Sequence, residues 1–300
     1  MNILINGASG FIGYHLIKEF LDNNHNVIAI CRKISTPLES LMSNPHLNVI
    51  VCSQQELFSN ICNLKVDVWF QLLWEGACGV LRSSPNVQIN NELLAIMAME
   101  VAHAINCKKI IYSGTVYENI SDKLLADHSF NKNSFYIISK KHTHEITYQL
   151  SKGYNMSYIW CQFCHPIGKF MNKGQLIPYT INSFINNYNV EFGKCDQWYD
   201  IVPVKNLAAA FRLLAEKETK SNFYYLGSNK PKILKDYILE VAKICNYKND
   251  IVFGLKQNDG LVYKKDWFNA SRFTSEFSFS EIESFEDAVS EIIAELKVLK

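Results

Sequence analysis

The chain has 300 residues, 48% of them hydrophobic, and a formal net charge of +1. It is long enough for a large core, and its charge gives no reason to expect nucleic acid or an anionic membrane as a partner. The sequence shows neither a signal-peptide pattern nor an apolar run of membrane-spanning length. Its nine cysteines include one close pair, which is not a disulfide framework, so we expect a cytoplasmic protein.

The first half alternates short apolar runs with segments of helical periodicity. It predicts strands at 2–6, 27–30, 48–51, 66–72, 109–113 and 157–160, and helices after residue 13, at 87–106 and at 134–150. Alternating buried strands and helices indicate an α/β fold of the Rossmann type, with a doubly wound parallel sheet.

Beyond residue 168 the pattern loosens. Helices are predicted at 176–188, 207–216, 234–245 and 285–299, with short strands at 200–204 and 223–226. We therefore expect a nucleotide-binding Rossmann domain over 1–165, to which 194–228 returns. Segments 166–193 and 229–300 are expected to form mainly a smaller C-terminal α/β substrate lobe.

A glycine-rich turn, GASGFIG, lies between the first strand and the first helix. Gly7 permits the tight turn, Gly10 lets backbone N–H groups approach a pyrophosphate, and Gly13 lets the helix pack closely on its strand. The strand and helix on either side are the context in which this pattern indicates a dinucleotide site. Phe11 and Ile12, inside the turn, are included in the predicted cofactor site.

The end of the second strand indicates which dinucleotide binds. An acidic residue there suits the ribose hydroxyls of NAD, and a basic one suits the extra phosphate of NADP. Arg32 and Lys33 follow this strand, and no Asp or Glu lies between Asp22 and Glu39. NADP(H) is favoured; the alternative is a solvated strand end and NAD(H).

A proton-transfer group is predicted from Tyr136 and Lys140, four residues apart on one helix face. An ammonium beside a phenol should lower the pKa of the tyrosine and make it a usable acid or base. Ser113 follows a sheet strand at its carboxyl end, where doubly wound folds bind ligands, and its hydroxyl could bond a substrate carbonyl.

The glycine turn, Ser113, Tyr136 and Lys140, in this order, resemble the extended short-chain dehydrogenase/reductases, the NAD-dependent epimerase/dehydratase family of nucleotide sugars. The resemblance covers nearly the whole chain. It implies that Ser113, Tyr136 and Lys140 are catalytic, that Tyr136 and Lys140 also contact the cofactor, and that Leu72 lies against it. It further implies a homodimer.

Three positions compare directly with the family's pattern. Asn91 matches its structural Asn, whereas Tyr199 and Asn206 replace the Arg and the second Asp of a segment otherwise similar to R-D-F-V-x-V-x-D.

The residues that follow Ser113 indicate which reaction the chain catalyses. Related dehydratases carry acids directly after the catalytic Ser or Thr, and epimerase-reductases carry a Cys two residues after it; here Gly114 and Thr115 follow Ser113. Hydride transfer remains, so the chain resembles nucleotide-sugar 4-keto reductases such as CDP-abequose and CDP-paratose synthases. That implies NADPH-dependent reduction of a nucleotide-diphosphate 4-keto-deoxysugar for surface polysaccharide. A 4-epimerase is the runner-up, and a non-catalytic NADPH-binding regulator ranks third.

Several further residues are candidate substrate contacts. Trp74 could line a sugar pocket or pack in the core, and Arg82 could meet a phosphate or be solvated. Trp198 could stack on a base or simply pack. Thr115 and Lys256 are also candidate substrate contacts, because of their positions in the sequence.

The stretch from Trp160 to His165 contains C-x-x-C-H, a haem-attachment spacing. Cys161 lies in a predicted buried strand, where two cysteines three apart face opposite ways, so we expect core cysteines. No further ligand pair follows Cys164, and no metal site is predicted. In the family alignment Gln162 replaces an Arg and His165 replaces an Asn that faces substrate, which makes His165 a candidate sugar contact.

Overall fold

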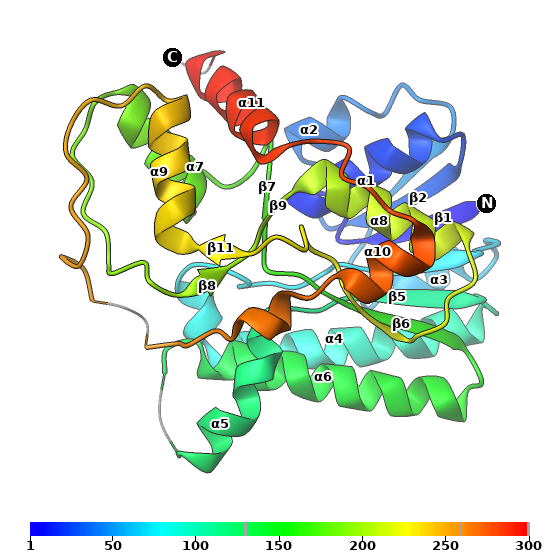
Figure 1. Cartoon of the computed structure of the whole chain (residues 1–300). Coiled ribbons are helices and arrows are strands. Elements are labelled where there is room, and N and C mark those ends of the chain that lie inside the picture. Colours follow the sequence, from blue (N-terminus) through cyan, green and yellow to red (C-terminus); the bar gives the residue numbers. More distant parts are fainter. Residues whose placement is uncertain (129–130, 258–259, 299–300) are drawn as a thin grey trace. The chain divides into compact units, whose positions relative to one another are not determined.

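The computed structural model describes residues 1–128, 131–257 and 260–298 (Figure 1). The chain forms two compact units, described separately below. The first comprises Met1–Gln162 and Ala208–Tyr224, and the second comprises Phe163–Leu207 and Tyr225–Lys300.

The first unit is built on a seven-stranded sheet with the order β10-β6-β5-β4-β1-β2-β3. Every pairing from β6 through to β3 is parallel. The strand order reverses between β1 and β4, which is where doubly wound sheets bind ligands. This sheet confirms the predicted Rossmann-type α/β fold. The strands are β1 (Asn2–Asn6), β2 (Asn26–Cys31), β3 (Leu47–Val51), β4 (Val68–Gln71), β5 (Lys109–Ser113), β6 (Ser157–Gln162) and β10 (Phe223–Tyr225).

Helices cover both faces of this sheet because successive strand residues point to opposite sides. Trp69 of β4 is fully buried in a cluster with Ala98 and Met99 of α4. Its neighbour Phe70 packs instead on Phe20 of α1, with ring centroids 5.4 Å apart. Helices α4 and α6 lie side by side (Figure 1). The helical segments are α1 (Phe11–Asp22), α2 (Thr36–Glu39), α3 (Leu57–Ile61), η1 (Val80–Ser83), α4 (Pro85–Ala104), η2 (Val116–Ile120), α5 (Ser121–Ala126), α6 (Ser134–Gly153) and α8 (Val204–Glu216), of which α8 begins in the second unit.

The second unit holds two short ladders. Strand β7 pairs in parallel with β9, and β8 pairs antiparallel with β11. Residues 194–207, which include β8 and β9, belong to the second unit, so only 208–224 of the expected segment 194–228 lies in the first. The elements are β7 (His165–Ile167), α7 (Leu176–Ile185), β8 (Trp198–Tyr199), β9 (Ile201–Pro203), β11 (Lys232–Ile233), α9 (Leu234–Ile244), η3 (Lys265–Phe268), α10 (Ser271–Phe277) and α11 (Phe285–Val298).

Asp200 separates β8 from β9 and divides the single strand predicted at 200–204. Its fully buried carboxylate accepts hydrogen bonds from the Tyr225 hydroxyl at 2.7 Å and from the Ser228 hydroxyl at 2.5 Å. A Cβ on Gly227 would lie 2.2 Å from this carboxylate, so the turn leaves no room for another residue. The aspartate thus holds the second unit's ladders to the turn after β10.

None of the helices that the structure describes combines the length and the apolar character needed to cross a membrane.

Candidate functional site

The glycine turn joins β1 to α1 as the sequence predicts. Gly7 has φ +96°, and a Cβ there would lie 2.8 Å from the Leu73 nitrogen. A Cβ on Gly13 would lie 2.5 Å from the Gly7 oxygen. Both positions therefore require glycine, and the N-terminus of α1 is left open for an anion.

A cavity of about 260 Å³ lies beside this turn. It brings together six of the residues predicted for the cofactor or substrate: Gly7, Gly10, Arg32, Lys33, Leu72 and Trp74. Gly13, Phe11 and Ile12 lie in α1 and do not line it. A glycine turn, the N-terminus of α1 and two basic residues beside one cavity together fit a dinucleotide.

The sequence interpretation missed a buried amide network in this cavity. The Asn6 amide nitrogen donates to the side-chain oxygens of Gln54, at 2.8 Å, and Gln71, at 3.0 Å. Asn6 ends β1, Gln71 ends β4 and Gln54 follows β3. The available signal was the appearance of polar residues where buried apolar strands end, because such ends meet at one edge of a parallel sheet.

Arg32, which lines the cavity, forms an ion pair with an acidic residue. Its Nη1 donates to a Glu75 carboxylate oxygen at 3.2 Å. The buried Asn91 side chain bonds both backbone atoms of Glu75, accepting from its nitrogen at 2.9 Å and donating to its oxygen at 2.7 Å. Asn91 therefore fixes the loop after β4, and Glu75 with it.

Ser113, Tyr136 and Lys140 are all buried at the carboxyl end of β5. Tyr136 and Lys140 lie one turn apart on α6. The Lys140 Nζ donates to the Ser113 carbonyl oxygen at 2.8 Å, which ties the helix to the strand end. Ser113 in turn donates from its hydroxyl to the Gln71 carbonyl oxygen at 3.4 Å.

Burial and neighbouring charges act on both proton-transfer groups. Burial raises the pKa of Tyr136 to about 12, opposed by the charge of Arg82 and a hydrogen bond with Thr115. Burial also lowers the pKa of Lys140 to about 7, opposed by the charge of Glu118. Burial penalises the charged form of each group, and Arg82 is a cation that favours the tyrosinate.

Arg82 is only half-buried. Its guanidinium lies between two rings, 4.2 Å from the Tyr136 centroid and 4.3 Å from the Tyr117 centroid. Trp74 also joins the site, because the Lys140 Nζ lies 3.7 Å from its ring centroid. The indole nitrogen of Trp74 donates to Gln88 at 2.8 Å, which orients the ring.

A buried carboxylate, Glu118, supports the loop after Ser113. It accepts from the Thr115 nitrogen at 2.6 Å, from the Trp160 indole at 2.9 Å and from the Gln162 amide at 3.0 Å. A Cβ on Gly114 would lie 2.2 Å from that indole nitrogen. The spacing from Thr115 to Glu118 is that of a capping box, a sequence signal that could have revealed this glutamate.

Three predicted substrate residues lie in the second unit. Burial lowers the pKa of His165 to about 4, and its Nε2 has no hydrogen-bond partner among the described residues. Trp198 carries the Lys265 ammonium 4.6 Å from its ring centroid. Lys256 is exposed. A buried imidazole nitrogen that has no partner among the described residues is able to bond a neutral ligand.

The cysteines at the C-x-x-C-H spacing do not share a strand, because β6 ends at Gln162, before Cys164. Both thiols are unbridged, and burial raises the pKa of each. Among the described residues, no group of three or more His, Cys, Asp or Glu side chains could hold a metal ion.

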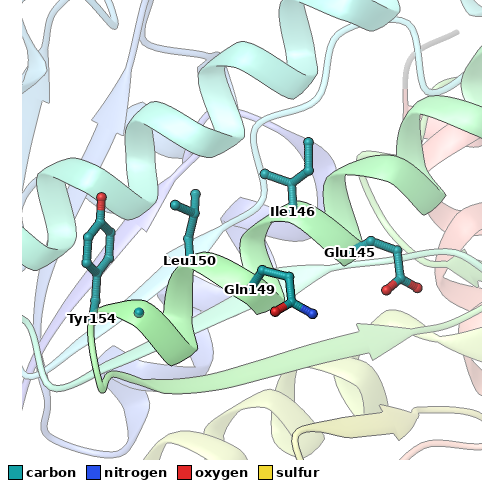
Figure 2. Close-up of a pocket in the computed structure, with 6 residues that line it drawn as sticks. Glu145, Ile146, Gln149, Leu150 and Tyr154 are labelled. Carbon is teal, nitrogen blue, oxygen red and sulfur yellow. The ribbon is translucent and has the colours of Figure 1, made fainter.

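A second hollow, of about 400 Å³, lies along α6 (Figure 2). Ile146 and Leu150 supply its apolar lining, with Glu145 and Gln149 along the same stretch of helix and Tyr154 just beyond the helix end. None of the cofactor or proton-transfer residues lines it.

Known proteins similar to this chain include two curated enzymes. CDP-abequose synthase from Salmonella typhimurium is 24% identical over 286 residues, covering 86% of this chain and 90% of the relative. The dTDP-6-deoxy-L-talose 4-dehydrogenase (NAD(+)) from Aggregatibacter actinomycetemcomitans is 24% identical over 258 residues, covering 83% of this chain and 92% of the relative.

Solved structures show the same fold. UDP-glucose 4-epimerase from Thermotoga maritima superposes with a TM-score of 0.80 at 19% identity, covering 100% of both chains. UDP-glucuronic acid 4-epimerase from Bacillus cereus superposes with a TM-score of 0.83 at 20% identity, again covering 100% of both. The model of the NAD dependent epimerase/dehydratase family matches residues 3–227. This chain therefore belongs to the NAD dependent epimerase/dehydratase family, the extended short-chain dehydrogenase/reductases.

Proposed function

We propose that this protein reduces the C4 ketone of a nucleotide-diphosphate 4-keto-deoxysugar with NADPH. The observation that carries the proposal is the convergence of Ser113, Tyr136 and Lys140 beside Trp74, which also lines the cavity at the glycine turn. Similarity to CDP-abequose synthase supports this substrate class. Biosynthesis of a surface deoxysugar in the cytoplasm remains a prediction.

In this proposal the cofactor, when bound, supplies a hydride to the ketone carbon. The Tyr136 phenol donates its proton to the ketone oxygen, and the Ser113 hydroxyl donates a hydrogen bond to the same oxygen. Lys140, held by the Ser113 carbonyl at 2.8 Å, orients the cofactor ribose. The tyrosinate left behind is then reprotonated from solvent.

The acids of the site argue against dehydration. Glu118, the carboxylate nearest in sequence to Ser113 on the carboxyl-terminal side, is only 2% exposed and is held by Thr115, Trp160 and Gln162. A carboxylate used in this way is poorly suited to removing a carbon-bound proton, since its lone pairs are already bonded. Thr115 itself offers no acid.

The proposal is tested by offering CDP-, dTDP-, GDP- and UDP-linked 4-keto-6-deoxysugars and following the loss of NADPH absorbance. We expect turnover with one nucleotide, and loss of roughly 10²- to 10⁴-fold in Tyr136→Phe with cofactor binding retained. Turnover unchanged in that variant, or none with any ketosugar, would refute the reductase.

A 4-epimerase is the second candidate, because the Arg32 guanidinium is already paired with Glu75 and the site could accept NAD. An epimerase uses the same Ser113, Tyr136 and Lys140 and regenerates its cofactor within each cycle. NAD⁺ retained by the purified protein, with no net oxidation of NADPH, would favour this alternative.

We also propose a homodimer formed through α4 and α6. Ile89 and Leu93, four residues apart on α4, are 54% and 60% exposed. The hollow lined by Ile146 and Leu150 lies on the neighbouring helix (Figure 2). Apolar side chains on two adjacent helices suit a self-complementary contact with a second copy.

A further inference from the structure

We infer that Glu75 is a specificity-determining residue, whose carboxylate competes with the 2′-phosphate of NADP(H) for Arg32. This inference rests on the proposed function and its cofactor site. The Glu75 carboxylate lies 3.2 Å from the Arg32 guanidinium. The pair is partly exposed, with 62% of the Arg32 side chain and 42% of the Glu75 side chain accessible.

The sheet topology places this ion pair over the glycine turn. Arg32 directly follows β2 and Glu75 comes shortly after β4, and both strands pair with β1 on its two sides. The Gly7 nitrogen bonds the Ile30 oxygen at 3.2 Å, while the Leu72 nitrogen bonds the Asn6 oxygen at 2.9 Å. Side chains from the two flanking strands can meet only by crossing the end of β1, where the turn begins.

Glu75 is held there by a built support. The Asn91 side chain bonds the Glu75 backbone nitrogen and oxygen, at 2.9 and 2.7 Å, and is itself 1% exposed. Because the backbone is fixed at both atoms, the Glu75 side chain starts from a defined position from which it reaches Arg32. A loop without this clamp could move the acid away from an incoming anion.

A 2′-phosphate carries about −1.5 to −2 charges at pH 7 and would compete for the same guanidinium. With Glu75 in place, either the ion pair must break or the phosphate must tolerate a nearby carboxylate. Both costs apply to NADPH and not to NADH, which lacks this phosphate. Lys33, beside the same cavity, remains as a second cation.

Fluorescence titration of NADH and NADPH into wild type and Glu75→Gln measures this effect without turnover. We expect the ratio of NADPH to NADH affinity to rise roughly threefold to fivefold in Glu75→Gln, the upper part of the range for charges exposed at a surface. The control Glu100→Gln removes an exposed charge near the C-terminal end of α4 and should leave the ratio of NADPH to NADH affinity unchanged.

A second pair of variants tests whether Glu75 acts through Arg32. In an Arg32→Gln background, adding Glu75→Gln should change the ratio less than about twofold, since the shared cation is gone. The inference would be overturned if Glu75→Gln changed the NADPH and NADH affinities equally, or if its effect on their ratio were undiminished in the Arg32→Gln background.

The same titration separates this inference from the proposed function. If every variant prefers NADH yet the ratio still rises in Glu75→Gln, the role of Glu75 stands and the NADPH assignment falls. If wild type binds neither cofactor, the cofactor site is refuted and the inference with it.

Discussion

Replacing Arg82 with Met should make Tyr136 a weaker proton donor and leave substrate binding nearly unchanged. The guanidinium lies 4.2 Å from the Tyr136 ring centroid and stabilises the tyrosinate by charge. The other groups acting on Tyr136 are Thr115, Tyr117 and Glu118 of the segment containing η2, with Trp74 packed edge to face against its ring. Of these, only Arg82 opposes burial through a positive charge.

The size of the effect follows from this geometry. Two unit charges about 4–5 Å apart interact by roughly 3–4 kcal/mol at an effective dielectric constant of 20, which is an upper bound. If about a third of this is realised in the transition state for proton transfer, kcat falls roughly fivefold to tenfold. Loss of the Arg82 cation raises the pKa of Tyr136 further above its burial-raised value, so the phenol becomes a weaker acid.

The assay is ketone reduction by wild type, Arg82→Met and Arg82→Lys at neutral pH. We expect kcat to fall in Arg82→Met and to fall less in Arg82→Lys, which keeps the positive charge, with KM for the sugar nucleotide nearly constant. A KM raised more than tenfold, with kcat unchanged, would show that Arg82 instead holds a substrate phosphate and would refute the reasoning.

Three further predictions concern the first unit: the pH dependence of its stability, its packing and its association with a second copy. Lys140→Met should raise the free energy of unfolding by about 2 kcal/mol more at pH 6 than at pH 9. The reason is that protonating a lysine with a pKa of about 7 destabilises the folded protein at pH 6, whereas the unfolded chain carries this proton without cost. Urea unfolding with no pH-dependent gain would contradict this. Gly114→Ala should lose about 3 kcal/mol in urea, since its Cβ would lie 2.2 Å from the Trp160 indole nitrogen. Gly153→Ala, where nothing lies within 4 Å, should lose nothing, and equal losses would argue against the clash. Leu93→Glu should convert a dimer to a monomer in light scattering, because its 60% exposed side chain lies on the proposed contact face; an unchanged mass would exclude that face.

The sheet was predictable because most of its strands are short apolar runs, and the central ones, such as β4, are buried on both faces. The predicted strand at 109–113 coincides with β5, and that at 2–6 coincides with β1. The second unit was harder, because ladders of two or three residues, such as β8 and β11, contain too few positions to show a period. There, a single buried group, Asp200, decides where one strand ends and the next begins.

The candidate site could be predicted only in part from the sequence, for a related reason. Tyr136 and Lys140 share a helix face at a spacing visible in the sequence, and α6 places them as predicted. The position of Arg82 between two rings depends on the path of the short η1 segment, which no periodicity encodes. The pairing of Arg32 with Glu75 likewise needs the strand order, because the two residues are 43 positions apart.

Lys140 shows how the site depends on several elements at once. Its ammonium is oriented by the Ser113 carbonyl from β5 and by the Trp74 ring from the loop after β4. Its pKa is lowered to about 7 by burial and raised by the charge of Glu118, so its charge near neutrality depends on a third segment. A group poised between two protonation states responds strongly to small changes in its surroundings. Substitutions in any of these three segments should therefore alter the charge of Lys140 without touching the lysine itself.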